Sequence, residues 1–421
     1  MPTMRHGRQR RSRLVGSILK FLGVAAAVVA LSAGSVVGIA VWQLASVAKH
    51  TIHLAGQEPE QTPPALGPAE GEVNLLLTGT DTRTGQSGAF QTKAELAGSS
   101  GAGSNDVNIL LHISSDHQSA TVVSFPRDLE IPIPACPKAS GGTIPAASRA
   151  MLNTTLSRGD LSCVALTISS MTGVHIPYAA SIKFDGVTAM SNAIGGVTVC
   201  LATPLKDNYT NPPLDLAAGE QTLVGPQALS FLRSRHGVGD GGDLGRISNQ
   251  QVFMSALTRK VVSGGVLGNP VKLYSLATTA VTNITPSDTL ANPIALVSIA
   301  LALKNVGLAN ILFIQYPTFA DPSDPNRVIP NASAASVLNA ALVADSRIIF
   351  TGAPGGAAQL PPTVAPLPQT ASPTPAPTTT PSKAPIHSPS ASPSPSAPSV
   401  SLPSSITGQT ADQQTCTKKD K

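Results

Sequence analysis

A run of 25 uncharged residues at positions 21–45 constrains this chain more than any other feature of its sequence. About 20 apolar residues suffice to cross a bilayer as a helix, so the run predicts a transmembrane segment. By the positive-inside rule, the arginine-rich arm at 1–20 stays in the cytoplasm and the remainder of the chain lies outside the cell. A cleaved signal peptide is the alternative, although its apolar region normally holds about 7–15 residues. In both cases the main domain is exported; in the first, the protein is a single-pass protein of the cell membrane.

The positive charge of the chain is concentrated in that arm. Of the 28 lysines and arginines, six lie in residues 1–20 with no acidic residue, which leaves 22 basic against 23 acidic side chains elsewhere. A protein that binds the phosphate backbone of a nucleic acid needs an excess of basic side chains on the binding domain. The sequence therefore predicts no nucleic-acid partner.

Composition divides the exported part into a linker, one folded domain and a tail. Residues 354–403 contain 15 prolines among serine, threonine and alanine, a composition that cannot bury a core and predicts a disordered spacer. The segment 406–416 is less repetitive and can dock on the domain. We therefore expect a linker at 46–69, a domain at 70–350 and a tail at 351–421.

Four cysteines fit an exported protein that holds disulfide bonds. They are Cys136, Cys163, Cys200 and Cys416. Of the three possible pairings we expect Cys136–Cys163, which pins a loop inside the domain, and Cys200–Cys416, which ties the tail back. Free or partly paired thiols are the alternative.

Three short apolar runs bounded by turn residues predict buried strands. They span residues 73–78, 107–113 and 121–125. The connection between the second and third runs is too short for a crossover, so these strands form an antiparallel hairpin. The start of one then lies beside the end of the other, which brings Asp106 near Arg127. If the first strand is also antiparallel to the second, Asp81 reaches the same edge of the sheet.

Two aspartates and an arginine at one edge indicate a site for a metal ion and a phosphate. Magnesium is typically held by one or two carboxylates with substrate phosphates and water, so Asp81 and Asp106 are the candidate metal ligands. The planar guanidinium of Arg127 suits a phosphate oxygen because it makes paired, charge-assisted hydrogen bonds. The alternative is structural: the aspartates cap strand ends, and Arg127 pairs with Asp128.

A second group of basic residues surrounds a glycine-rich loop at 237–242, between two predicted helices. Arg233 and Arg235 follow the end of the first helix. Near the start of the second, Arg246 and Gln250 are four residues apart and share one side. Helix N-termini attract phosphate through free N–H groups and the helix dipole. The sequence thus predicts an anion site here, with ordinary solvated arginines as the alternative.

In these motifs the chain resembles the LytR–CpsA–Psr proteins of Gram-positive bacteria, which transfer glycopolymers from lipid carriers onto the cell wall. The motifs are Leu-Thr-Gly-Thr-Asp-Thr-Arg (77–83), Ser-Asn-Asp (104–106), Ser-Phe-Pro-Arg-Asp (124–128), Phe-Asp-Gly (184–186), Gly-Gly-Val (195–197), Asp-Leu-Ala-Ala-Gly (215–219), Phe-Leu-Arg-Ser-Arg-His (231–236) and Gly-Asp-Leu-Gly-Arg-Ile-Ser-Asn-Gln-Gln (242–251). The resemblance implies an α/β fold, namely an α/β/α sandwich with a central mixed or antiparallel sheet and a hydrophobic pocket for a polyprenyl chain. The candidate lining of that pocket consists of the apolar segments 161–172, 187–194 and 295–303, with ordinary core packing of these segments as the alternative.

The resemblance also implies roles for single residues. Asp81 and Asp106 match the aspartates that hold Mg²⁺, with Mn²⁺ as the alternative ion. The residues that match those gripping the pyrophosphate of the carrier are Arg127, Arg233, Arg235, Arg246 and Gln250. These aspartates and arginines together form the implied catalytic set. Many members carry an arginine two residues before the second aspartate, where this chain has Ser104.

The expected activity is phosphoryl transfer of a glycopolymer from a polyprenyl-pyrophosphate carrier to a peptidoglycan acceptor at the membrane. Such chemistry depends on positioning and charge stabilisation and needs no covalent nucleophile. Asp81 or Asp243 is the candidate proton acceptor. Two alternatives stay open: a phosphatase that hydrolyses polyprenyl pyrophosphate with Mg²⁺, and a non-catalytic polyprenyl-lipid-binding regulator of the envelope.

Overall fold

The computed structural model describes residues 51–55, 67–86, 90, 92–99, 101–138, 141–263, 265–361 and 399–420. The predicted cytoplasmic arm (1–20) and transmembrane segment (21–45) lie outside these residues, as do much of the predicted linker and residues 362–398 of the proline-rich spacer. Within the described ranges, no helix combines the length and the apolar character needed to cross a membrane.

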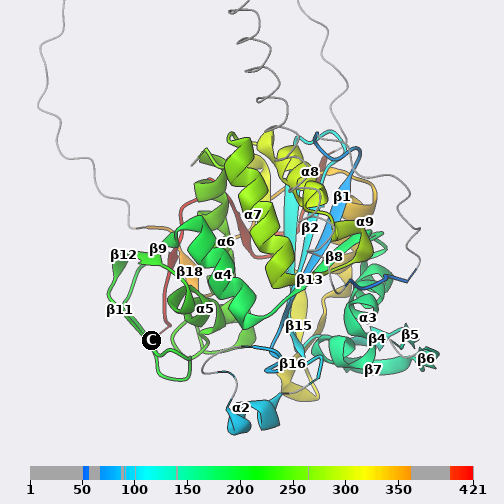
Figure 1. Cartoon of the computed structure of the whole chain (residues 1–421). Helices are drawn as coiled ribbons and strands as arrows, with labels where there is room; N and C mark the ends of the chain where they lie inside the picture. Colours follow the sequence, from blue (N-terminus) through cyan, green and yellow to red (C-terminus); the bar gives the residue numbers. More distant parts are fainter. Residues whose placement is uncertain are drawn as a thin grey trace, which may run out of the picture. The chain divides into compact units, whose positions relative to one another are not determined.

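A seven-stranded mixed sheet forms the centre of the fold, in the order β13-β8-β1-β2-β3-β14-β20 (Figure 1). Its strands are β1 (Val73–Thr80), β2 (Asn105–Ile113), β3 (Ala120–Phe125), β8 (Tyr178–Ile182), β13 (Ile284–Pro286), β14 (Ile311–Gln315) and β20 (Gly408–Thr410). The predicted hairpin β2–β3 is antiparallel and so is β1–β2, whereas β8 and β14 run parallel to β1 and β3. The three predicted strands are confirmed. Their directions bring the end of β1, the start of β2 and the end of β3 to one edge.

Helices pack on both faces of this sheet because successive residues of a strand point to opposite sides. The helices concerned are α3 (Thr155–Thr172), α6 (Asp243–Ser263), α8 (Pro293–Lys304) and α9 (Ala332–Val343). On β3, Val123 packs in one core with α3 and α9, and Val122 packs in another with α8 and part of α6. Figure 1 shows α3 and α9 on the opposite side of the sheet from α6 and α8. The molecule therefore has a mixed α/β fold with a central mixed sheet between helices.

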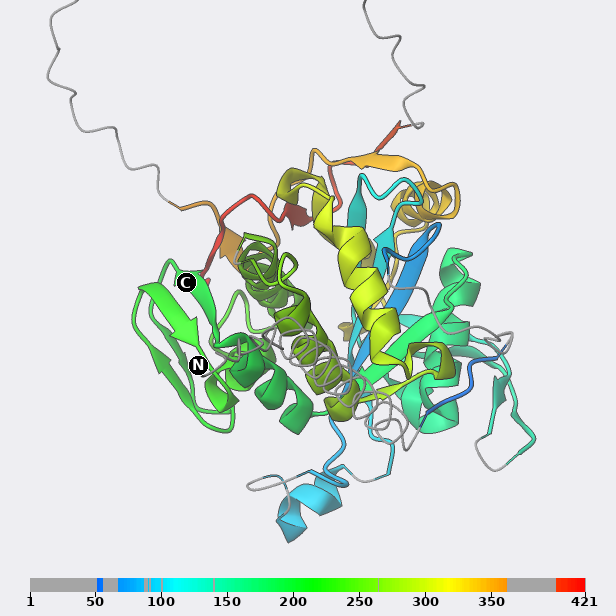
Figure 2. The same ribbon diagram turned by 45° about the horizontal axis from the view of Figure 1, so that its top comes forward.

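The C-terminal segment 399–420 adds strands to three sheets, of which the central sheet and a smaller one bear on the site. A smaller sheet runs in the order β12-β9-β21-β18. Its strands are β9 (Val197–Leu201), β12 (Gly219–Leu223), β18 (Ala358–Gln359) and β21 (Cys416–Thr417). β20 pairs with β14 at the edge of the central sheet, and β21 pairs with β9. Figure 2 shows the red C-terminal end of the chain running to these green strands. The residues after the spacer are thus part of the fold.

Both disulfides have the expected pairing. The Cα atoms of Cys136 and Cys163 are 5.2 Å apart, and those of Cys200 and Cys416 are 4.4 Å apart. In the second pair the strand register places Cys416 directly beside Cys200. All four cysteines are used, so the alternative of free thiols is wrong.

Shorter elements complete the connections in the described chain. They are α2 (Lys93–Gly98), β4 (Glu130–Ile133), β5 (Cys136–Pro137), β6 (Thr143–Ile144), β7 (Ala147–Met151), η2 (Leu152–Thr154), α4 (Phe184–Ile194), β10 (Leu205–Asp207), β11 (Leu214–Leu216), α5 (Pro226–Arg233), α7 (Pro270–Asn283), η3 (Asp288–Leu290), η4 (Leu308–Asn310), β15 (Thr318–Asp321), β16 (Asp324–Pro330), β17 (Arg347–Ile349) and β19 (Ser399–Ser401). Of these, α4 and α5 matter most for function, because they form walls of the site described next.

Candidate active site

An irregularity in the β1–β2 ladder sets the position of Asp106. Gly79 pairs with Val107 while Thr80 pairs with Asn105, so Asp106 is the extra residue of a β-bulge. A bulge bends its strand and redirects the side chain of the extra residue. The side chain of Asp106 is accordingly 25% exposed at the end of the sheet rather than sealed under a helix.

Arg127 reaches Asp106 from the neighbouring strand, which ends two residues earlier. Its Nη1 donates to Oδ1 of Asp106 at 2.8 Å, and its Nε lies 3.4 Å from Asp128. Asp128 is also paired with Arg327, 3.6 Å away. Burial acts to lower the pKa of Arg127, but Asp106, Asp128 and Asp243 outweigh it and raise the pKa above its ordinary value. Arg127 thus contacts Asp106, as the predicted metal and phosphate site requires, and also Asp128, as the structural alternative requires.

Asp243, the first residue of α6, lies at the centre of an arginine cluster formed by Arg127, Arg235 and Arg246. Its Oδ1 lies 2.7 Å from Nη2 of Arg246 and 3.0 Å from Nη2 of Arg235. The Nε of Arg127 is 3.8 Å from the same oxygen. Three guanidinium groups share the carboxylates of Asp243 and Asp106, and Asp128 is shared by Arg127 and Arg327. These four arginines therefore face three aspartates, which leaves positive charge that an anion can neutralise.

The crowding of like charges in this cluster affects the pKa of Arg235. Burial lowers this pKa most, and the guanidinium groups of Arg246 and Arg127 lower it further. Asp243 and Asp106 act in the opposite sense without cancelling these effects. A bound anion would oppose the repulsion, so the electrostatics of the cluster favour one.

Arg246 and Gln250 project from one side of α6, as their spacing predicts. Arg246 donates from Nη2 to the backbone oxygen of Asp106 at 2.5 Å. Gln250 donates from Nε2 to the backbone oxygen of Leu232 at 2.9 Å. The first bond ties α6 to the bulge and the second ties it to α5. Together they fix the helix that carries Asp243.

Arg233, which lines the same pocket as the arginine cluster, lies over an aromatic ring. Its guanidinium carbon is 4.2 Å from the ring centroid of Phe184, the first residue of α4. The guanidinium of Arg83 lies 4.7 Å from the same centroid. Such cation–π contacts favour a cationic side chain that is partly removed from water. Arg233 is therefore held against the wall formed by α4.

Asp81 is held at the same edge of the sheet by the loop before β2. Its Oδ1 accepts the N–H of Ser104 at 2.7 Å and the hydroxyl of Ser99 at 2.9 Å. Its Oδ2, like that of Asp106, accepts no hydrogen bond from the described residues. Two carboxylates that each keep an oxygen available fit a hard cation such as Mg²⁺, which takes oxygen ligands and retains water.

An apolar pocket of about 380 Å³ opens beside the arginine cluster, between β1, β2, α4, α5 and α6. Its apolar lining consists of Leu77, Val107, Ile109, Ile182, Phe184, Val187, Met190, Ile194, Val197, Leu229, Leu232, Phe253, Met254 and Leu257. Six of the seven predicted site residues line the same pocket, namely Asp106, Arg127, Arg233, Arg235, Arg246 and Gln250. Asp81 is the one that does not. The arginine cluster thus adjoins an apolar pocket.

Only one of the three candidate lining segments contributes to this pocket. Residues 187–194 belong to α4 and line it. Residues 161–172 belong to α3 and pack on the other face of the sheet, and residues 295–303 belong to α8 and fill a core. The prediction for these two segments was wrong because an apolar run indicates burial without indicating which face of a sheet it covers.

The sequence does not predict that Asp243 holds three arginines together or that Arg233 lies over the ring of Phe184. The sequence suggests Asp243 only as a proton acceptor, whereas the structure surrounds it with three arginines. Its signal is an aspartate in the first turn of a helix, three residues before an arginine. Phe184 carries no comparable signal, since nothing in its motif indicates that an arginine stacks on it.

A separate group of possible metal ligands lies at the opposite end of β1 and β2. Ligand atoms of Glu72, His112 and Asp345 all lie within 4.8 Å of one another. Asn74 pairs with His112 in the ladder and Thr80 pairs with Asn105, so this group is about 20 Å of strand away from the bulge. The group could hold a metal ion, but the strand length separates it from the arginine cluster.

Comparison with known proteins agrees with the motifs. The LytR_cpsA_psr family model matches residues 39–342. The cell wall biosynthesis protein LcpA of Corynebacterium glutamicum is 32% identical over 301 residues, which cover 66% of this chain and 56% of that protein. The probable cell wall biosynthesis protein LcpB of the same bacterium is 31% identical over 216 residues, covering 51% of this chain and 48% of LcpB.

A third relative is the polyisoprenyl-teichoic acid–peptidoglycan teichoic acid transferase TagU of Enterococcus faecalis. It is 28% identical over 216 residues, which cover 51% of this chain and 61% of TagU. The chain spans about half the length of the two Corynebacterium relatives. The family model nevertheless matches well over half of the chain. The chain therefore belongs to the LytR_cpsA_psr family.

Proposed function

We propose that this protein is a transferase that moves a glycopolymer from a polyprenyl-pyrophosphate carrier onto peptidoglycan by Mg²⁺-dependent phosphoryl transfer. The observation that carries the proposal is the arginine cluster at an apolar pocket of about 380 Å³. A polyprenyl pyrophosphate has the matching pair of chemistries, a doubly charged head group and a hydrocarbon chain. The name of the TagU relative, a polyisoprenyl-teichoic acid–peptidoglycan transferase, supports the same assignment.

In the proposed reaction the arginine cluster binds and orients the pyrophosphate, and the apolar pocket takes the polyprenyl chain. A hydroxyl of a peptidoglycan sugar attacks the phosphorus on the glycan side. A new P–O bond forms while the bond from that phosphorus to the bridging oxygen breaks. The products are a phosphodiester between glycan and wall and a polyprenyl phosphate, which takes the electron pair of the broken bond. The hydroxyl proton passes to a carboxylate or to water.

The residues of the chain contribute positioning and charge. Arg127, Arg235 and Arg246 stabilise the negative charge that spreads over the phosphoryl oxygens in the transition state. Asp243 is engaged by all three guanidinium groups, so we assign it the role of holding them in place rather than of accepting the proton. Asp81 and Asp106 would hold Mg²⁺, which, when bound, neutralises charge on the pyrophosphate.

We further propose that residues 21–45 anchor the domain on the outer side of the cell membrane. The uncharged run behind a basic arm supports this orientation. The two disulfides also support it, since such bonds persist in oxidising, exported compartments.

The experiment uses the full chain in detergent micelles with a short-chain polyprenyl-pyrophosphate glycan, peptidoglycan fragments and Mg²⁺. The measurement is the amount of glycan joined to peptidoglycan. Asp106→Ala and Arg127→Ala should each reduce transfer by about 10³-fold or more, because each removes charge from the reacting phosphates. A chelator should abolish transfer, and added Mg²⁺ should restore it.

Arg327→Ala is the matched control, because Arg327 also pairs with Asp128 but lies outside the arginine cluster. It should retain activity, and circular dichroism should show all three variants folded. Transfer at the wild-type level in Asp106→Ala or Arg127→Ala would refute the site. Release of glycan phosphate and polyprenyl phosphate by water in place of transfer would identify a hydrolase of the carrier, and lipid binding without turnover would identify a lipid-binding regulator.

A further inference from the structure

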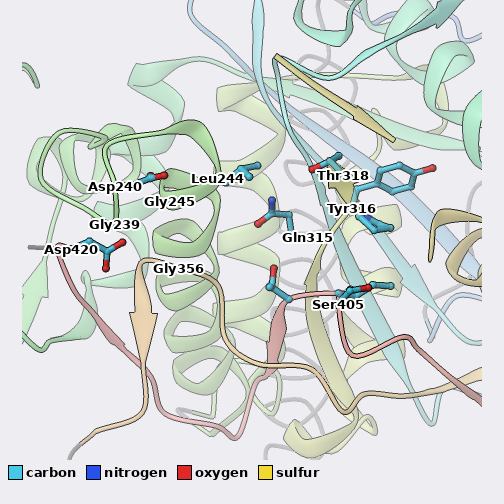
Figure 3. Close-up of a pocket in the computed structure, with 13 residues that line it drawn as sticks. Gly239, Asp240, Leu244, Gly245, Gln315, Tyr316, Thr318, Gly356, Ser405 and Asp420 are labelled. Carbon is cyan, nitrogen blue, oxygen red and sulfur yellow. The ribbon is translucent and has the colours of Figure 1, made fainter. Parts of the chain in front are cut away.

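A second, polar pocket of about 300 Å³ lies beside the first turn of α6. Four segments of the chain build it: the loop that leads into α6 with its first turn, the end of β14 with the residues that follow, Gly356 before the spacer, and the C-terminal segment after the spacer. Figure 3 shows residues of these segments around one space, with Leu244 of α6 facing Ser405 of the C-terminal segment across it. Its volume is at the lower end of the range for small-ligand sites.

Gln315, the last residue of β14, supplies an unsatisfied polar group in this pocket. The residue is only 8% exposed, and its carboxamide makes no hydrogen bond with any described residue. Figure 3 shows its oxygen and nitrogen in the middle of the pocket. The amide oxygen and nitrogen remain accessible from the pocket rather than sealed from solvent, so water or a bound molecule can complete their hydrogen bonds. A largely buried side chain that presents its amide to the pocket suits a ligand that both donates and accepts hydrogen bonds.

The remaining lining shows the chemistry of that ligand. The pocket is lined by no lysine, arginine or histidine, in contrast to the arginine cluster, so it does not suit a phosphate. Its acidic residues are Asp240 and Asp420, and Thr318 and Ser405 add hydroxyl groups. Carboxylate, amide and hydroxyl groups together match a ring that carries several hydroxyl groups. Leu244 and its apolar neighbours offer a surface for the C–H groups of such a ring.

The pocket also lies next to the proposed reaction centre. Leu244, which lines it, directly follows Asp243 of the arginine cluster. Gln315 pairs with Ser124 in the β14–β3 register, three residues before Arg127. The first turn of α6 is thus shared by the two sites.

We infer that this polar pocket binds a sugar of the peptidoglycan acceptor and presents its hydroxyl to the phosphoryl group. The inference rests on the proposed function for the role of the sugar, whereas the binding itself can be measured alone. The C-terminal segment is the outer wall of the pocket. Gly239 donates its N–H to the oxygen of Lys418, and Asp420 donates its N–H to the oxygen of Gly239, each at 2.9 Å. The Cys200–Cys416 disulfide fixes this wall.

The test measures binding of N,N′-diacetylchitobiose, a neutral disaccharide of amino sugars, to the full chain in detergent by NMR titration without any donor. Gln315→Met keeps the length of the side chain but removes its hydrogen-bonding group, and it should weaken binding about tenfold. Gly356→Trp should abolish binding by filling the pocket. A Cβ added at Gly356 meets no atom within 4 Å, so this substitution introduces no clash at its Cβ. Inorganic pyrophosphate binding should be unchanged in both variants.

Gln118→Met and Gly67→Trp are the matched controls, because Gln118 is exposed and a Cβ at Gly67 also meets open space. Both should bind the disaccharide like the wild type. The inference is overturned if the wild type binds pyrophosphate but not the disaccharide, or if both pocket variants bind it normally. Disaccharide binding that depends on Gln315, in a protein that transfers no glycan, would keep the sugar pocket and refute the proposed function instead.

Discussion

The two ends of the β1–β2 ladder arrange their charged groups in opposite ways. At the bulged end, Asp106 is part-exposed and belongs to a cluster with surplus positive charge. At the regular end, His112 is buried with its Nδ1 2.8 Å from Asn74 and its Nε2 3.1 Å from Asp345. Both ring nitrogens of this histidine therefore have partners. At the regular end the polar side chains therefore satisfy one another inside the fold, whereas the bulge holds Asp106 part-exposed beside the arginine cluster.

Among the changes that compare the two ends, the largest expected effect follows from removing the carboxylate of Asp243, which the three arginines of the cluster share. Asp243→Ala leaves Arg127, Arg235 and Arg246 without their common partner, so they repel one another and lose their positions. We expect transfer to fall by about 10²–10³-fold, measured as glycan joined to peptidoglycan. The control is Asp215→Ala, whose exposed carboxylate lies outside the site. Equal activity in Asp243→Ala and wild type would show that the three arginines hold their places without it.

A change at the regular end should lower the stability of the protein and leave its transfer activity unchanged. His112→Leu leaves Asn74 and Asp345 without their buried partner, so the free energy of unfolding should fall by about 1–3 kcal/mol. Transfer activity should stay at the wild-type level, because the site is about 20 Å of strand away. Denaturant titration checks the first statement, with the exposed His175→Leu as its control. A loss of activity without a loss of stability would contradict the division between the two ends.

The smallest expected effect is on the pH dependence of stability, through the carboxylate of Asp207. Burial acts to raise the pKa of Asp207, but hydrogen bonds from Ser234 and from the N–H groups of Tyr209, Gly237 and Arg235 outweigh it, so the pKa is lowered from 3.8. The ionised carboxylate therefore stabilises the fold above pH 3.8, and this contribution is lost as the pH falls through the lowered pKa.

Asp207→Asn should accordingly lose on the order of 1 kcal/mol of the free energy of unfolding near neutral pH. The difference from the wild type should shrink on acidification below pH 3.8, the ordinary value for this group. Urea titrations of both proteins at neutral and acidic pH provide the measurement. A difference that is constant with pH would mean that the carboxylate of Asp207 makes no charge-dependent contact with the loop after α5.

The sequence predicts the part of this site that depends on local rules. A short connection between two apolar runs requires a hairpin, and the hairpin alone places Asp106 beside Arg127. The spacing of Arg246 and Gln250 places them on one side of a helix in the same way. The implied set of site residues nevertheless rests on the family resemblance, and their roles stay predictions.

What the sequence does not predict depends on contacts between distant segments. The bulge at Asp106 arises from the register of two strands, and the position of Asp243 depends on how α6 docks against the end of β3. The polar pocket needs residues from the C-terminal segment, which follow a proline-rich stretch with no sign of a fold. An apolar run likewise shows that a segment is buried but not which face of the sheet it covers, as residues 161–172 illustrate.

The place of β20 and β21 near the end of the chain has a consequence for how the protein is made. During synthesis β14 emerges with an unpaired edge and keeps it until residues 408–410 are present. Cys200 likewise waits for Cys416, a separation of 216 residues. An open strand edge readily pairs with another chain, and such exposure favours misassociation. Nascent or shortened chains that end before residue 408 would therefore carry an exposed strand edge and an unpaired thiol, and residues 408–416 remove both hazards.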